Sequence, residues 1–118
     1  MVIYLTICNF AVRVVLVREE DGIQLLVHYV SKRLANVETR YTSLEKLAYA
    51  LILASQKLRP YFQMHRIKVR TSYPLRKVMD KPEESGQILK WTVELSQFEV
   101  DYKPMTAIKG QALADFIL

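Results

Sequence analysis

The first third of the chain consists of short runs of apolar and β-branched residues, which predict extended strands. Three runs cover Val2–Cys8, Ala11–Arg18 and Ile23–Val30, and they are rich in the Val, Ile, Leu and Tyr residues that favour a pleated sheet. Asn9-Phe10 and Glu20-Asp21-Gly22 separate the runs, and glycine allows the positive φ that tight turns require. The pattern therefore predicts an antiparallel meander.

After Arg40 the apolar residues recur at helical spacing, which predicts an amphipathic helix. Thr42 and Glu45 fit a capping box at its start, in which each side chain accepts a hydrogen bond from the backbone amide of the other residue. Pro60 is expected to end the helix, because proline lacks the amide proton and disfavours helical geometry in the residue before it. The buried stripe is predicted to comprise Leu44, Leu47, Ala48, Leu51, Ser55 and Leu58.

Apolar and cationic residues alternate over Arg66–Thr71, which predicts a half-buried strand with one cationic face. Farther along, Pro74–Met79 is expected to form a short helical turn. Ser85 is a suitable N-cap for a helix that carries Ile88, Trp91, Thr92 and Leu95 on one stripe.

The remaining residues predict one more strand and one more helix. Phe98–Tyr102 is expected to be the fifth strand, which Pro104 ends, and a last helix is expected from Gly110 onward. The resulting order of elements is βββαβαβα. It predicts a single α/β domain over residues 1–118, with helices flanking a five-stranded mixed sheet.

The composition is that of an ordered globular domain. Of 118 residues, 51% are hydrophobic and 25% charged, with only 3 Gly and 4 Pro, so the chain is neither disordered nor low-complexity. A single cysteine, Cys8, excludes an internal disulfide framework and favours an intracellular setting. The longest uncharged stretch, Met1–Val12, is too short to cross a bilayer, and no cation precedes it as in a secretory signal. We expect no membrane partner.

Positive charge is concentrated in the middle of the chain. The formal net charge is +5, and no acidic residue lies between Glu45 and Asp80. Such a block favours nucleic-acid phosphates, although a solvated surface that keeps the domain soluble is an equal alternative on charge alone. The cations of this block are Lys46, Lys57, Arg59, Arg66, Lys68, Arg70, Arg76 and Lys77.

Several short strings, spread in order over almost the whole chain, resemble one family. They are Val30-Ser31-Lys32, Tyr41-Thr42-Ser43-Leu44-Glu45-Lys46, Leu58-Arg59-Pro60-Tyr61-Phe62, Thr71-Ser72-Tyr73-Pro74-Leu75, Lys90-Trp91 and Gln111-Ala112-Leu113-Ala114-Asp115. The chain resembles the RNase H-like domain of the reverse transcriptase polyprotein of gypsy-type long-terminal-repeat retrotransposons, and most of all the plant lineage with two such domains in tandem. One departure is Gln87, where relatives usually show arginine. The resemblance implies the RNase H-like fold and a fragment of a longer polyprotein.

The resemblance also implies a set of metal ligands. In this family two Mg²⁺ ions flank the scissile phosphate, and four carboxylates hold them. Carried over one position at a time, the first acid falls on Asn9, the second on Leu47 and the third on Ser72, and only the fourth is retained, as Asp115. The resemblance therefore implies that Asp115 would hold a metal ion weakly at most, and that this copy binds no Mg²⁺.

Glu45 is the acid closest in sequence to Leu47 and is the candidate to replace it as a ligand. Two residues correspond to roughly 200° around a helix, so the two side chains should point in nearly opposite directions. The capping role of Glu45 is therefore favoured over a ligand role.

The other residues of chemical interest favour structural roles. Cys8 is predicted to be a buried, inert thiol rather than a nucleophile, because no basic residue lies near it in sequence. His28 and His65 lack metal-ligand spacing and are expected in ordinary packing or surface positions. Trp91 and Phe98 are expected to pack in the core rather than to stack on bases.

These observations favour a degenerate, connection-type RNase H-like domain. It would support the adjacent reverse transcriptase and contact an RNA–DNA hybrid or DNA duplex, while a second RNase H domain of the polyprotein performs cleavage. The contacts are expected from Arg66, Lys68, Arg70, Arg76 and Lys77. The parent polyprotein would also be an RNA-directed DNA polymerase, located in a cytoplasmic particle or the nucleus.

Two alternatives stay open. One is an active, Mg²⁺-dependent RNase H, a hydrolase that cuts the RNA of RNA–DNA hybrids; it would need acids at positions 9, 47 and 72, and the sequence has none there. The other is a non-functional relic of a genomic insertion.

Overall fold

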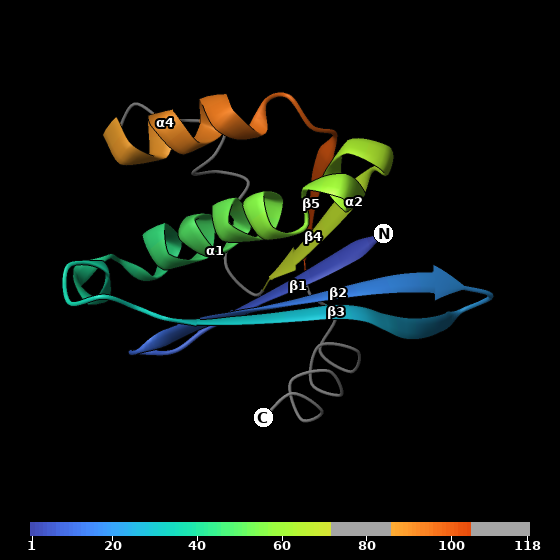
Figure 1. Cartoon of the computed structure of the whole chain (residues 1–118), viewed down its shortest axis with the longest axis horizontal. Helices are drawn as coiled ribbons and strands as arrows, with labels where there is room; N and C mark the ends of the chain where they lie inside the picture. Colours follow the sequence, from blue (N-terminus) through green and yellow to red (C-terminus); the bar gives the residue numbers. More distant parts are fainter. Residues whose placement is uncertain (72–85, 105–118) are drawn as a thin grey trace.

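A computed structural model describes residues 1–71 and 86–104 of the chain (Figure 1). The elements follow the predicted order, with one additional short helix and a single turn of 3₁₀ helix. They are β1 (Val2–Ile7), β2 (Ala11–Glu20), β3 (Ile23–Arg33), η1 (Glu38–Arg40), α1 (Ser43–Lys57), α2 (Arg59–Met64), β4 (Ile67–Thr71), α4 (Gly86–Leu95) and β5 (Val100–Pro104).

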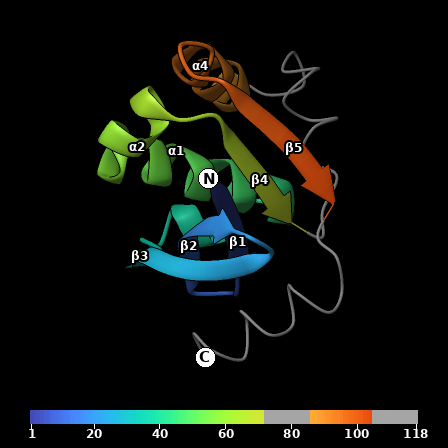
Figure 2. The same cartoon turned by 90° about the vertical axis from the view of Figure 1, so that its right-hand side faces the viewer.

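The strands form one five-stranded mixed sheet in the order β3-β2-β1-β4-β5. β1 pairs with β2 and β2 with β3 in antiparallel fashion, which confirms the predicted meander. β4 then adds to the other side of β1, and β5 adds to β4, both in parallel. Figure 2 shows α1, α2 and α4 together on one face of this sheet.

The turn between β2 and β3 has the geometry that its sequence predicts. Asp21 has a φ of 53° and Gly22 a φ of 79°, and positive φ at both central residues is the property of the tight turns that suit the twist of a hairpin. Both strands run farther than their apolar runs suggested, to Glu20 and to Arg33, because ladder pairing is made by the backbone and continues through polar residues.

The main core lies between the helices and the sheet. Alternate residues of β1, β2 and β4 meet the stripe of α1, and α4 contributes Ile88, Trp91 and Leu95. The stripe of α1 is buried as predicted, except that Leu44 at its first turn is half-buried. On the opposite face of the sheet, Val2, Tyr4, Val15 and Val17 form a second buried cluster.

α1 begins as predicted, but the chain around Pro60 differs from the prediction. Thr42 is the N-cap of α1, whereas α1 ends at Lys57 and α2 begins at Arg59, so that Pro60 lies in the first turn of a second helix. Proline is tolerated there because the first amides of a helix have no intrahelical acceptor. The prediction that Pro60 only ends a helix was therefore incomplete.

The chain between α4 and β5 also differs from the prediction. The Phe98 amide donates to the Leu95 carbonyl at 3.0 Å, and its ring lies 5.5 Å from that of Phe62, so Phe98 belongs to the connecting turn and β5 starts at Val100. Pro104 is the last residue of β5. The predicted turn at Pro74–Met79, the Ser85 cap and the helix from Gly110 lie outside the described residues.

Cys8 corrects another prediction. Its amide donates to the Ala11 carbonyl at 2.9 Å in the turn that follows β1, and its side chain is exposed. The expectation of a buried thiol was wrong, because the apolar run continues by one residue, Cys8 itself, beyond the last residue of the strand. Among the helices that the structure describes, none has both the length and the apolar character needed to span a membrane.

Candidate functional site

The structure describes two of the four positions that the resemblance assigned to metal-binding acids. Leu47 lies in the second turn of α1 with only 1% of its surface exposed, inside the main core. Asn9 is exposed in the turn between β1 and β2. Ser72 and Asp115 lie outside the described residues. Because Leu47 offers no oxygen, the second ligand position does not fit a Mg²⁺ ion.

Glu45 is engaged in the capping box and does not replace Leu47. The backbone amide of Thr42 donates to Glu45 Oε1 at 2.9 Å, and the amide of Glu45 donates to Thr42 Oγ1 at 3.2 Å. Both bonds hold the carboxylate at the helix start, as predicted. Within residues 1–71 and 86–104, no group of three or more His, Cys, Asp or Glu side chains is placed to hold a metal ion.

Thr6 lies near the C-terminal end of β1, close to Asn9, and the sequence pattern did not single it out. Its hydroxyl oxygen is buried and has no hydrogen-bond partner within the described part of the chain. It belongs to β1 proper, three positions before Asn9. The signal available in the sequence was a single threonine in a strand otherwise made of Val, Ile, Tyr and Leu.

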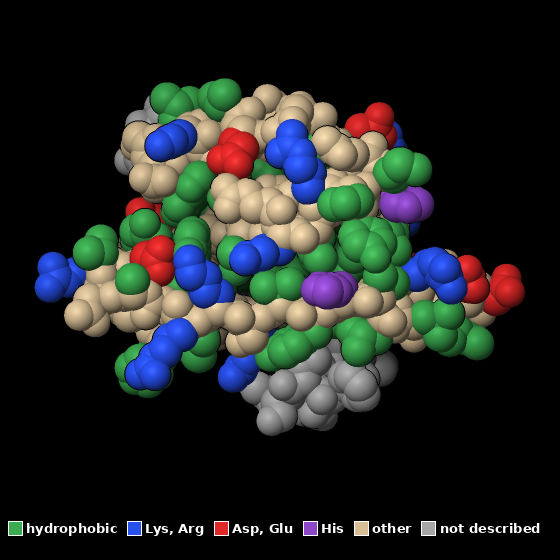
Figure 3. Space-filling model, viewed as in Figure 1, with side chains coloured by type: hydrophobic (Ala, Val, Ile, Leu, Met, Phe, Trp, Pro, Cys, Tyr) green, Lys and Arg blue, Asp and Glu red, His purple; other side chains and the backbone are tan. Residues whose placement is uncertain are grey.

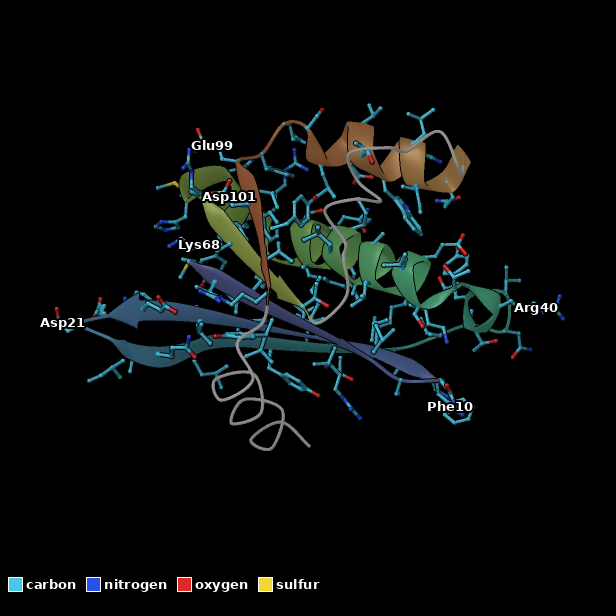
Figure 4. The ribbon with its side chains drawn as sticks, turned by 180° about the vertical axis from the view of Figure 1, so that it is seen from behind. Phe10, Asp21, Arg40, Lys68, Glu99 and Asp101 are labelled. Carbon is cyan, nitrogen blue, oxygen red and sulfur yellow. The ribbon has the colours of Figure 1, made fainter. Side chains whose placement is uncertain are left out.

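The predicted cationic strand is present as β4, but two acidic side chains lie beside its cations. Arg66 Nε lies 3.2 Å from Glu99 Oε2 and 3.7 Å from Asp101 Oδ2. Asp101 is also the β5 partner of Lys68, and Figure 4 shows Lys68, Glu99 and Asp101 at one corner of the sheet. The local sequence could not predict these acids, because they lie more than thirty positions away, Asp101 in β5 and Glu99 just before it.

Lys68 and Arg70 share the face of the sheet that lies opposite α1. Their β1 partners are Val2 and Tyr4, which belong to the second buried cluster. Lys68 is exposed and Arg70 half-buried. Arg76 and Lys77, the other two predicted contacts, lie outside the described residues.

Tyr41, Tyr49 and Trp91 form an aromatic cluster between α1 and α4, and the ammonium group of Lys32 contacts this cluster. The Trp91 ring lies 5.9 Å from that of Tyr41 and 6.0 Å from that of Tyr49, which confirms a packing role for Trp91. Lys32 Nζ, from the end of β3, donates to the Tyr49 hydroxyl and lies 5.0 Å from its ring centroid. This hydrogen bond raises the pKa of Lys32, and burial raises the pKa of Tyr41.

The two histidines are both exposed and lie in different parts of the fold. His28 is in β3, whereas His65 follows α2. This agrees with the surface role expected for them.

A three-stranded antiparallel meander, extended in parallel by β4 and β5 and covered by helices on one face, defines the RNase H-like fold. The same fold occurs in the foamy viral protease–reverse transcriptase. One structure of that protein, in complex with an RNA/DNA hybrid, matches with a TM-score of 0.71 and 20% identity over 90% of this chain and 15% of that one. Another, in complex with double-stranded DNA, matches with a TM-score of 0.69 and 20% identity over 90% of this chain and 23% of that one.

Sequence comparison identifies the family. Residues 1–98 match the RNase H-like domain found in reverse transcriptase, and the chain belongs to this family. The retrovirus-related Pol polyprotein from the Drosophila melanogaster transposon opus is 28% identical over 100 residues, which is 81% of this chain and 10% of that polyprotein. The chain thus spans a small part of the proteins that it matches.

Proposed function

We propose that this chain is a non-cleaving, connection-type RNase H-like module of a retrotransposon reverse transcriptase polyprotein. The observation that carries the proposal is the burial of Leu47 at the second acid position. The capping role of Glu45, the nearest acid in sequence, supports it further. With no oxygen at this position and no acid at positions 9 and 72, two Mg²⁺ ions would lack the negative charge that holds them.

We further propose that the polyprotein belongs to the plant gypsy-type lineage with two RNase H domains. The short strings from Val30-Ser31-Lys32 to the terminal Ala114-Asp115 support this lineage. In such a polyprotein a second RNase H domain would cleave the RNA strand, and this module would pack beside the polymerase.

The proposed ligand is a nucleic-acid duplex held through its phosphates. Two observations support it: the net charge of +5, and the fold shared with a reverse transcriptase that was solved in complex with an RNA/DNA hybrid and with double-stranded DNA. Lys68 and Arg70 would make the contacts from β4. Arg66 would contribute less, because Glu99 and Asp101 already offset its charge.

The first experiment tests cleavage. Purified protein is incubated with a labelled RNA–DNA hybrid and Mg²⁺, and we expect no product. Mn²⁺ in place of Mg²⁺ should not change this result. Cleavage by the unmodified chain that disappears in Asp115→Asn would refute the proposal.

A series of reversions tests whether the three missing acids account for the expected lack of cleavage. Asn9→Asp, Leu47→Glu and Ser72→Asp together should be the minimum for any activity, and no single reversion should suffice. Because Leu47 lies in the core, Leu47→Glu must first be shown by circular dichroism to fold. Activity restored by one reversion alone would contradict the proposed loss of the whole site.

The second experiment tests duplex binding by its dependence on salt. Each phosphate contact contributes about 0.9 to the slope of log affinity against log salt concentration on duplex DNA. Replacing Arg66, Lys68 and Arg70 by alanine should therefore reduce the slope by about two to three units in fluorescence anisotropy. A control removes the same charge elsewhere, at Arg40, Lys57 and Lys90, which are all exposed. Equal slopes for the two variants would mean that β4 does not contact the duplex.

A further inference from the structure

β3 is the outermost strand on its side of the described sheet, and much of its surface is apolar. Between Ile23 and Val30 it carries no Asp, Glu, Lys or Arg. Edge strands of monomeric proteins are usually protected by charges, proline, bulges, short length or a covering element. Over its first eight residues, this strand of eleven has no charged side chain and no proline. The exposed large apolar side chains along it are Ile23, Leu25, Leu26 and Tyr29, with 40–62% of their surface exposed.

A bulge at Val27 determines which side chains share a face. Leu26 pairs with Val17 and His28 with Leu16, so Val27 is the additional residue. Directly paired residues of an antiparallel ladder share a face. Leu26 and Tyr29 therefore lie on the face of the second buried cluster, with Val17 and Val15, whereas His28 and Val30 lie on the α1 face.

We propose that the outer edge of β3 pairs with β3 of a second copy of this chain, antiparallel, about a two-fold axis at His28. With Val27 left unpaired in each copy, Tyr29 faces Leu26 of the second copy, and Val30 faces Leu25. Farther out, Ser31 faces Gln24. In these three pairs the side chains share a face, and apolar residues meet apolar residues while polar meets polar. The next pair sets Lys32 beside Ile23.

The charges at the two ends of β3 fit an antiparallel pair. The hairpin tip before β3 carries Glu19, Glu20 and Asp21 against one Arg18, whereas Lys32 and Arg33 lie at the far end. Figure 3 shows acidic side chains at the tip of the hairpin and Lys and Arg side chains toward the opposite end, and Figure 4 shows Asp21 and Phe10 at those two ends.

In an antiparallel pair, the acidic tip of each copy lies beside the basic end of the other. A parallel pair would place like charges together, which is unfavourable. This complementarity between the acidic β2–β3 turn and the basic end of β3 favours a second copy of the same chain over an unrelated strand. Because edge pairing buries a small area, we expect a weak dimer, with a dissociation constant on the order of 10–500 μM.

Sedimentation equilibrium of the full chain tests the proposal. His28→Lys places two ammonium groups against each other across the axis and should raise the dissociation constant at least about tenfold. Gln87→Lys is the control, because Gln87 is also exposed but lies on α4, across the helical layer from β3, and it should leave association unchanged. A chain that stays monomeric at about 1 mM, or a dimer that both variants weaken equally, would overturn the proposal.

Oxidative cross-linking tests the axis itself. In a Cys8→Ser background, His28→Cys should form a disulfide-linked dimer, because residues facing each other at the axis have Cα atoms within the range that a disulfide spans. Gln87→Cys, on the exposed side of α4, should not in the same background. Failure of His28→Cys to cross-link, or equal cross-linking by both, would overturn the two-fold register. If another strand of the polyprotein occupies this edge instead, the isolated chain will remain monomeric.

Discussion

Replacing Trp91 by alanine tests directly how α4 packs on α1. The Trp91 side chain is 5% exposed and contacts the rings of Tyr41 and Tyr49. Truncating a buried aromatic residue costs about 3–5 kcal/mol. An aromatic pair contributes about 0.5–1.5 kcal/mol beyond its buried area, and Trp91 makes two such pairs. We therefore expect a loss in the upper half of that range, about 4–5 kcal/mol.

Urea unfolding followed by far-ultraviolet circular dichroism measures this loss without relying on the removed indole. Val93→Ala is the matched control, because Val93 lies on the same helix but is 64% exposed, and it should change the free energy of unfolding by less than about 0.5 kcal/mol. A loss below about 1 kcal/mol for Trp91→Ala, or a loss equal to that of the control, would refute the packing of α4 described above.

Two further predictions concern the start of α1 and alkaline pH. Thr42→Ala removes one bond of the capping box and should cost about 1 kcal/mol, whereas Ser43→Ala should cost clearly less; equal losses in urea would contradict the capping role. The raised pKa values of Lys32 and Tyr41 mean that the native state holds both protons more tightly than the unfolded chain. The stability that these raised pKa values contribute is therefore complete at a pH below the ordinary pKa, which is 10.5 for Lys32 and 10.0 for Tyr41. It is lost as the pH rises through the pKa that each group has in the native state. Tyr49→Phe keeps the ring but removes the acceptor of Lys32, so it should lessen this alkaline loss; identical pH profiles in urea titrations would show that the bond contributes nothing.

Local patterns in the sequence predicted the local parts of the fold. The capping box at Thr42 and the meander were readable because the residues that form them lie close together in the chain. The second helix at Pro60 was missed because proline fits both the residue after a helix and the first turn of the next one. Cys8 was misplaced because hydrophobic character alone does not reveal where ladder pairing stops.

The candidate site was less predictable than the fold, since it depends on contacts distant in sequence. The ion pairs of Arg66 with Glu99 and Asp101 require the parallel addition of β5 to β4, which no local window contains. The contact of Lys32 with Tyr49 likewise joins a strand to a helix. The burial of Leu47, in contrast, was readable from the helical stripe. Only the family resemblance indicates that Leu47 occupies the position of a metal-binding acid.

The central position of β1 has a consequence for the order in which the domain folds. β1 reaches β2 across a short turn, but its partner on the other side, β4, begins only at Ile67. Closing the longer loop costs more chain entropy, and pairing of distant segments slows folding. During synthesis we therefore expect the meander to emerge and pair first, which leaves the edge of β1 around Ile3 unpaired until β4 has been synthesised. Variants that weaken the pairing of β1 with β4 should lengthen this interval, in which the nascent chain is most prone to aggregate.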